Sequence, residues 1–194
     1  IQNGSIVAQI SYIDFSGVNV IKKIYNSILV VNSGVNFNIV NLTSYQIVGT
    51  SSVSHPAAIN VLEKLSNDIL LSGSTDGSIK MWNITSLALM NQNFVTTKNA
   101  LELARPMSNG MLLTCEKFTS LYEYEVNATV ASYPATDEIE NALPSNPQSF
   151  CNDLRTFNQT IIIATNDQVR MFDGSSLSLI LNPNTAYDTV YSLG

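Results

Sequence analysis

Few residues in this chain have the types and the spacing that catalysis needs. His55 is the only histidine among the 194 residues, and it is the natural candidate for a general base. No nucleophile motif such as Gly-x-Ser-x-Gly accompanies it. The sequence also shows no convergent pair of carboxylates for acid–base chemistry. We therefore expect a protein that is not an enzyme.

The candidate metal motifs are equally incomplete. Asp76-Gly77 resembles the middle of a calcium loop, but the spacing Asp-x-Asp/Asn-x-Asp/Asn-Gly is not met. The pair is typical of a tight turn, because glycine adopts positive φ at little cost. Cys115 and Cys151 form no Cys-x-x-Cys pair and no cluster with histidine. We therefore expect neither a metal nor another cofactor.

Five Asn-x-Ser/Thr sequences are candidate acceptors of N-linked glycans, at Asn3, Asn41, Asn83, Asn127 and Asn158. A chain this rich in Asn, Ser and Thr would contain a similar number by chance. Their placement is more informative, because Asn41, Asn83 and Asn127 each follow a predicted strand, at an exposed turn. Sparse charge, abundant asparagine and turn-located acceptors favour an extracellular, secreted glycoprotein. A cytoplasmic protein with accidental sequons is the alternative.

The composition excludes several classes of protein. Hydrophobic residues make up 45% of the chain and charged residues only 12%, and the net charge is −6. Nucleic-acid binding needs a clustered basic face, and the nine Lys and Arg residues are spread thinly. No apolar stretch is long enough to span a membrane. The chain opens with Ile1 and shows no charged leader, so we expect a removed signal peptide or an excised segment.

A repeat of about 42 residues runs along the chain. Its clearest marker is Trp82, at the end of the alternating segment SIKMW. Val40, Tyr124 and Phe172 end similar segments at nearly the same spacing, and Asn or an acidic residue follows each marker. Alternation with period two predicts a strand at all four places. Three further short strands accompany each marker, with Gly, Asn, Asp and Ser between them. The unit is therefore four short antiparallel strands, a to d.

The segment STDGSIKMWN resembles the signature of the WD-repeat β-propeller family, with Trp82-Asn83 where the family has Trp-Asp. SHPAAIN lies where the family has its Gly-His pair. The resemblance implies an all-β propeller of four-stranded blades, a radial stacking that buries both faces of each sheet. It also implies a buried hydrogen-bonded tetrad of four positions, for which the candidates are His55, Ser72 or Ser74, Asp76 and Trp82. The other three blades keep the period but lose most signature residues.

We expect blades at roughly 17–49, 58–92, 99–133 and 148–182, a leading d strand at 4–10 and a trailing a strand at 187–194. Strands b and c that would close a ring with the leading strand are absent. Three arrangements fit: a fragment of a larger propeller, a ring or filament completed by a neighbouring copy, or four blades with irregular ends. Unpaired strand edges at Ile6–Gln9 and Thr189–Leu193 would be the joints.

An acidic segment separates the third and fourth expected blades. PATDEIENALPSNPQSF, residues 134–150, contains Asp137, Glu138 and Glu140. Long loops on rigid scaffolds often bind partners, and a solvated acidic loop is the simpler interpretation. Part of the segment, TDEIENAL, has a pattern that fits a turn or two of helix.

Cys115 follows strand b of the third expected blade, and Cys151 lies in strand a of the fourth. Adjacent blades would bring the two sulfur atoms within bridging distance. A disulfide and two buried thiols are equal alternatives.

These observations predict a non-catalytic β-propeller scaffold that associates with other proteins or with copies of itself. We expect an extracellular glycoprotein with a structural role, assembling through its strand edges. The alternative is a cytoplasmic adaptor that recruits protein partners through its loops.

Overall fold

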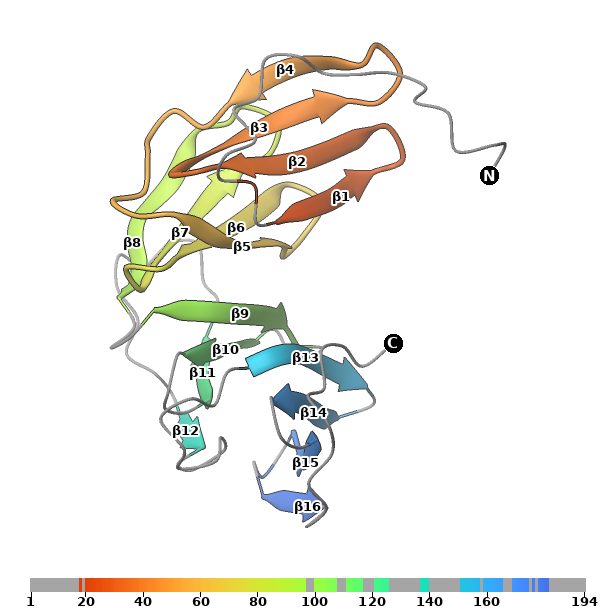
Figure 1. The fold of residues 1–194 in the computed structure, drawn as a ribbon, viewed down its shortest axis with the longest axis vertical. Coiled ribbons are helices and arrows are strands. Elements are labelled where there is room, and N and C mark those ends of the chain that lie inside the picture. The colour runs from red at the N-terminus through yellow and green to blue at the C-terminus, as the bar shows by residue number, and fades with distance from the viewer. Residues whose placement is uncertain are drawn as a thin grey trace.

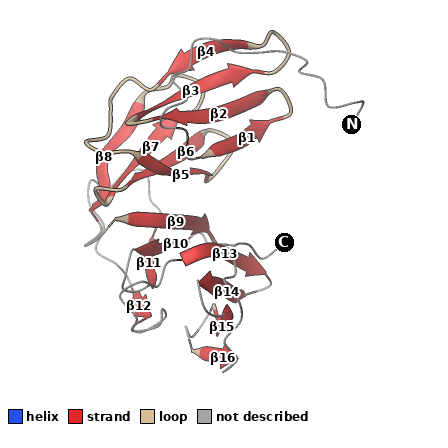
Figure 2. Ribbon diagram, in the orientation of Figure 1, coloured by secondary structure: helices blue, strands red, loops and turns tan. Residues whose placement is uncertain are grey.

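The computed structural model describes residues 18, 20–96, 100–107, 111–116, 121–125, 137–139, 151–157, 159–165, 169–174, 176 and 178–181. Within these ranges the chain forms strands and turns and no helix (Figures 1 and 2). The strands make four separate sheets, each with four antiparallel strands in chain order. The prediction of an all-β chain built from four-stranded antiparallel sheets is confirmed.

The first two sheets occupy the N-terminal half of the described chain. Sheet one contains β1 (Ile21–Tyr25), β2 (Ile28–Ser33), β3 (Asn36–Asn41) and β4 (Gln46–Thr50). Sheet two contains β5 (Ile59–Lys64), β6 (Ile69–Ser74), β7 (Ser78–Asn83) and β8 (Leu89–Thr96). The expected turn at Asp76-Gly77 joins β6 to β7, and Gly77 takes a φ of 85° there.

The other two sheets repeat the arrangement. Sheet three contains β9 (Leu101–Pro106), β10 (Met111–Glu116), β11 (Leu121–Glu125) and β12 (Asp137–Ile139). Sheet four contains β13 (Cys151–Phe157), β14 (Thr160–Thr165), β15 (Val169–Asp173) and β16 (Leu179–Leu181). The expected terminal strands at 4–10 and 187–194 lie outside the described residues.

One strand differs from the prediction. We expected the third blade to end at residue 133, with its fourth strand at 129–133, and these last residues lie outside the described ones. The described strand that pairs with β11 is β12, beyond the expected end of the blade, with Leu121 opposite Ile139 and Glu123 opposite Asp137. The expected helical turn is also wrong at these residues, because 137–139 are extended. Residues 137–139 read Asp-Glu-Ile and show no alternation, so periodicity could not identify them as a strand.

The repeat markers occupy one register position in all four sheets. Each pairs with an aliphatic residue on the second strand of its sheet, and all four markers are buried. The pairs are Val40 with Leu29, Trp82 with Leu70, Tyr124 with Leu112 and Phe172 with Ile161. The structure is therefore periodic even where the residue types have diverged.

The sheets stack face to face, and the core lies in the junctions between them. The first strands β1, β5, β9 and β13 contact one another in that order. Separate apolar clusters fill the junctions between sheets one and two, two and three, and three and four. In the first junction the rings of Phe37 and Trp82 meet edge to face, with centroids 5.0 Å apart. This stacking buries apolar surface that a lone four-stranded sheet would expose.

Candidate functional site

A continuous chain of buried hydrogen bonds crosses sheet two. Trp82 donates from Nε1 to the Ser72 hydroxyl at 2.7 Å, and Ser72 lies 2.7 Å from His55 Nε2. On the other side of the ring, His55 Nδ1 lies 2.8 Å from the Ser78 hydroxyl. Ser78 in turn donates to Asp76 Oδ1 at 2.7 Å. The chain ties the turn after β6, strands β6 and β7, and the segment before β5 into one unit.

The order of donors fixes the histidine tautomer. The Asp76 carboxylate accepts the Ser78 proton, so Ser78 must accept from His55, which places the imidazole hydrogen on Nδ1. His55 Nε2 is then the acceptor of the Ser72 hydroxyl. Every polar atom in the chain is satisfied only while the ring is neutral. Protonation of Nε2 would set two donors against each other.

The electrostatic environment favours this neutral state. Burial lowers the pKa of His55 from 6.5 to about 4, Lys80 adds to the decrease, and Asp76 opposes it. Burial alone would raise the pKa of Asp76, but the hydrogen bonds from Ser78 and Ser74 outweigh it and hold the value below its usual range. A neutral, buried imidazole whose two nitrogens are both occupied is suited to holding structure. It offers no free nitrogen to a substrate.

Four of the five predicted tetrad candidates take part in this chain of hydrogen bonds. Ser72 is the serine that takes part, whereas Ser74 donates to the Ala57 carbonyl oxygen at 3.0 Å. Ser78 links aspartate to histidine and was missed by the sequence analysis. Its place directly after Asp76-Gly77, where a turn returns the chain toward His55, was the available signal.

Charged residues also occupy one register position on the first strand of every sheet. These residues face aliphatic partners on the second strand, and the pairs are Lys22 with Val30, Glu63 with Leu71, Arg105 with Leu113 and Arg155 with Ile162. We call this set, together with Asp153, the inner ladder. Sequence reasoning missed it, although its members lie about one repeat apart.

Ion pairs connect the inner ladder across all three junctions, with alternating sign. Buried Glu63 binds both Lys22 and Arg105. Arg105 Nη2 lies 3.8 Å from Asp153 Oδ1, and Arg155 Nε lies 3.1 Å from Asp153 Oδ2. Arg105 also donates from Nε to the Leu154 carbonyl oxygen at 3.0 Å. The ladder therefore ties each sheet to the next along the innermost strands.

Two of the predicted glycan acceptors lie in matching turns. Asn41 Oδ1 accepts from the backbone nitrogens of Thr43 and Ser44 at 2.7 and 3.2 Å. Asn83 Oδ1 does the same for residues two and three positions on, at 3.0 and 2.8 Å. These bonds use Oδ1, whereas an N-linked glycan attaches to Nδ2. The acceptors at Asn3, Asn127 and Asn158 lie outside the described residues.

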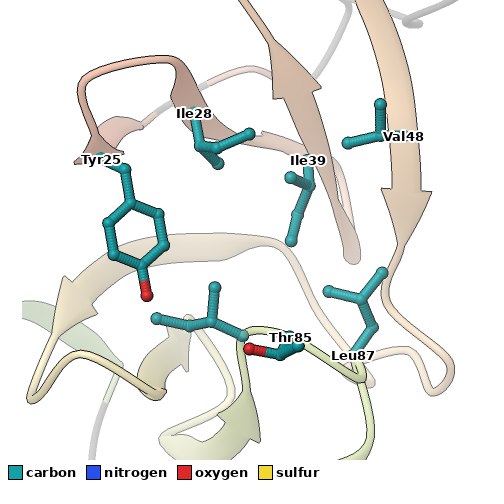
Figure 3. Close-up of a pocket in the computed structure, with 7 residues that line it drawn as sticks. Tyr25, Ile28, Ile39, Val48, Thr85 and Leu87 are labelled. Carbon is teal, nitrogen blue, oxygen red and sulfur yellow. The ribbon is translucent and has the colours of Figure 1, made fainter.

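An apolar cavity of about 190 Å³ lies beside these turns, between sheets one and two (Figure 3). Leu87, which has a φ of 57°, projects from the turn after β7 toward Gly49 on β4. A Cβ at Gly49 would overlap the Leu87 side chain. Val48 is exposed at the rim. The cavity is lined by Tyr25, Ile28, Ile39, Val48, Ile84, Thr85 and Leu87. It has the chemistry of a surface that receives apolar side chains.

The acidic segment does not have the form we expected. Asp137 and Glu138 belong to strand β12, paired with β11, and not to a loop. Hydrogen bonding to the sheet is the physical reason, because it fixes their backbone as extended. Glu140 lies outside the described residues.

Cys115 and Cys151 are buried thiols in the junction between sheets three and four. Burial raises the pKa of Cys115 well above its usual range, and its hydrogen bond with Cys151 adds to the increase. Both side chains belong to one buried cluster, which is compatible with either alternative. A bond between them stays a prediction.

The fold of this chain resembles solved structures, although its sequence matches no known family. The sequence matches no protein-family profile and no curated protein. Among solved structures it resembles the β-propeller domain of Myceliophteria thermophila Cps50 (Swd1), with a TM-score of 0.70 and 14% identity. The fold is that of a β-propeller. Each four-stranded sheet is accordingly a blade, and the predicted fold class is confirmed.

Two computationally designed proteins resemble the propeller as well. Ika4 aligns with a TM-score of 0.67 and 13% identity, over 88% of this chain and 98% of that one. Ika8 aligns with a TM-score of 0.62 and 16% identity, over 90% of this chain. The alignment with Cps50 covers 95% of this chain and 60% of the Cps50 domain. The alignment with Ika8 covers 50% of the Ika8 chain, so this chain spans only part of the length of both structures. These likenesses concern the fold alone.

Two features are absent from the described residues. None of these residues forms a helix long and apolar enough to cross a lipid bilayer. In the same part of the chain, no three His, Cys, Asp or Glu side chains gather in a way that could hold a metal ion.

Proposed function

We propose that this chain is a non-catalytic propeller scaffold of the WD-repeat type that associates with proteins, including copies of itself. The fold is consistent with a scaffold for protein interaction. The WD-repeat assignment is supported by the buried chain from Trp82 to Asp76 in blade two. The observation that carries self-association is an open apolar face on blade four.

The open face becomes clear when equivalent positions are compared. Two residues after the inner-ladder position of each sheet, on the first strand or just past its end, lie Ile24, Leu65, Met107 and Phe157. The first three pack into the junction with the following blade. Phe157, on the last described blade, is 69% exposed. Exposed aromatic surface of this kind favours association.

Neighbouring side chains extend the same face. Ile162 and Met171 pair with each other across β14 and β15, on the side of the sheet that carries Arg155, and both are half-buried. The residues equivalent to Ile162 in the preceding blades are fully buried, and they are Val30, Leu71 and Leu113. Ile39 and Met81, which are equivalent to Met171 in blades one and two, are buried as well. A second copy of the chain would therefore bury the same kinds of residue that the internal junctions already bury.

We further propose that the protein is an extracellular glycoprotein. The support is the shared geometry of Asn41 and Asn83, which sit at matching turns of adjacent blades with their Nδ2 atoms outside the turn hydrogen bonds. Thr43 and Thr85, the hydroxyl residues of these two sequons, are exposed. Bulky glycans at turns of this kind would keep a surface with few charges soluble.

The alternative function is a cytoplasmic adaptor. The apolar cavity between blades one and two favours it, because Tyr25, Val48 and Leu87 could receive the side chains of a partner protein. In that case the partner would bind at the turns, and glycans at Asn41 and Asn83 would obstruct it.

Phe157→Asp tests the self-association. We expect the molar mass of the wild type in sedimentation experiments to rise with concentration, and the variant to stay monomeric because a carboxylate opposes burial of the face. Val48→Asp, at a position on sheet one that is 55% exposed, is the control and should associate like the wild type. A wild type that remains a compact monomer at high concentration would contradict the proposal. If the protein secreted from eukaryotic cells had the intact mass of the unmodified chain, this result would contradict the glycoprotein proposal and favour the adaptor.

A further inference from the structure

One pair of positions makes contact at successive junctions of the propeller. At the first junction Asn32, on β2, donates from Nδ2 to the carbonyl oxygen of Ile59, on β5, at 3.0 Å. At the second junction Gly73, on β6, faces Leu101, on β9. A Cβ at Gly73 would overlap the Leu101 side chain. At both junctions, equivalent residues are therefore in contact: one on the second strand of a blade, and one on the first strand of the following blade.

At the third junction both positions are cysteines. Cys115 occupies on β10 the place of Gly73 on β6, since each follows the residue opposite the inner ladder by two positions. Cys151 pairs with Thr165 as Ile59 pairs with Ser74. Both thiols belong to one buried cluster with Leu113, Leu154 and Ile163. Register and cluster membership therefore place the two side chains next to each other in this junction.

We propose that Cys115 and Cys151 form a reversible disulfide that fastens blade four to blade three. The oxidant is a small disulfide such as glutathione disulfide. One cysteine thiolate attacks a sulfur of the oxidant and releases one glutathione thiolate. The second cysteine thiolate then attacks the mixed disulfide and releases the other glutathione. Two protein thiols are oxidised, one glutathione disulfide is reduced to two glutathiones, and the protons pass to solvent.

Burial assigns different roles to the two sulfur atoms. Cys115 is fully buried, and its raised pKa keeps it a thiol while the junction is closed. Cys151 lies at the start of β13 and is 6% exposed against 0% for Cys115, so we expect the oxidant to reach Cys151 first. Exchange must then await a local opening of the junction, after which Cys115 completes the bond. The bond would prevent blade four from separating from blade three.

The experiment uses the full chain in native buffer at mildly alkaline pH. Incubation with glutathione disulfide should give a monomer lighter by two hydrogens, and peptide mapping should show Cys115 linked to Cys151. The thermal midpoint should rise by about 5 to 10 °C and return on reduction with dithiothreitol. Because the reversal is measured on the wild type, the test does not depend on a variant that folds.

Cys115→Ser provides the matched control. It should retain one glutathione adduct, at Cys151, because no second thiol can displace it. Wild-type chains that carry glutathione on both cysteines, that link to other chains, or that gain no thermal stability when linked would overturn the proposal. None of these outcomes depends on self-association or secretion, so the test is separate from that of the proposed function.

Discussion

Blades two and four fill the same register positions with opposite chemistry. In blade two the second strand places Ser72 beside Trp82, and both belong to the buried hydrogen-bonded chain. In blade four the equivalent residues are Ile163 and Phe172, which pack in an apolar cluster. All four side chains are buried. A blade is therefore defined by the register of its strands. The buried positions of that register can hold either hydrogen-bonded polar side chains or packed apolar ones.

The largest expected effect is at Trp82. Trp82→Ala should lower the free energy of unfolding by about 4 kcal/mol, because it removes a fully buried ring and the donor to Ser72. Phe172→Ala should cost about 3 kcal/mol through lost packing alone. Urea unfolding followed by circular dichroism measures both.

A double-mutant cycle with Ser72→Ala separates the two blades. We expect a coupling of about 1 kcal/mol between Ser72 and Trp82, which touch, and none between Ser72 and Phe172. Equal coupling in both cycles would show that the polar chain does not distinguish the blades.

The second effect is a pH dependence confined to blade two, because His55 is the only histidine. Its pKa is about 4 in the folded chain against 6.5 when unfolded, so the unfolded chain binds the proton more tightly. The contribution of neutral His55 to the free energy of unfolding is therefore complete above about pH 6.5. It falls by about 3 kcal/mol in total as the pH drops toward 4. His55→Gln should flatten the unfolding free energy across this window. An unchanged slope in the variant would assign the effect to other groups.

The smallest effects concern the inner ladder. Glu63→Gln should cost about 2 kcal/mol, because it leaves Lys22 and Arg105 facing each other without the buried carboxylate. Arg155→Gln, at the half-exposed end of the ladder, should cost less than about 0.5 kcal/mol. Chemical denaturation of the two variants side by side gives the ratio. Similar costs would mean that the ladder is no stronger inside the stack than at its edge.

The sequence predicted the strands well where alternation was strong. Trp82 and its three counterparts marked the third strand of each blade because apolar and polar residues alternate before them. Strand β12 was missed, because its sequence Asp-Glu-Ile carries no alternation and only its pairing with β11 makes it a strand.

The candidate sites divide in the same way. His55, Asp76 and Trp82 were found because a single blade retains them close together in the sequence. Ser78 was missed because its role depends on the turn that returns it to His55. The inner ladder was missed because the ion pairs of Glu63 join residues 41 and 42 positions apart, and only the stacked sheets bring these residues together.

Leu87 holds a left-handed backbone conformation that glycine would adopt more easily, and its side chain fills the space above Gly49 on the neighbouring blade. Backbone strain at the turn is thereby offset by contact across the junction. The turn works as a spacer that sets how closely blades one and two approach. A smaller side chain at the position of Leu87 would leave the space above Gly49 empty and would relieve the strain of the left-handed conformation only if it were glycine.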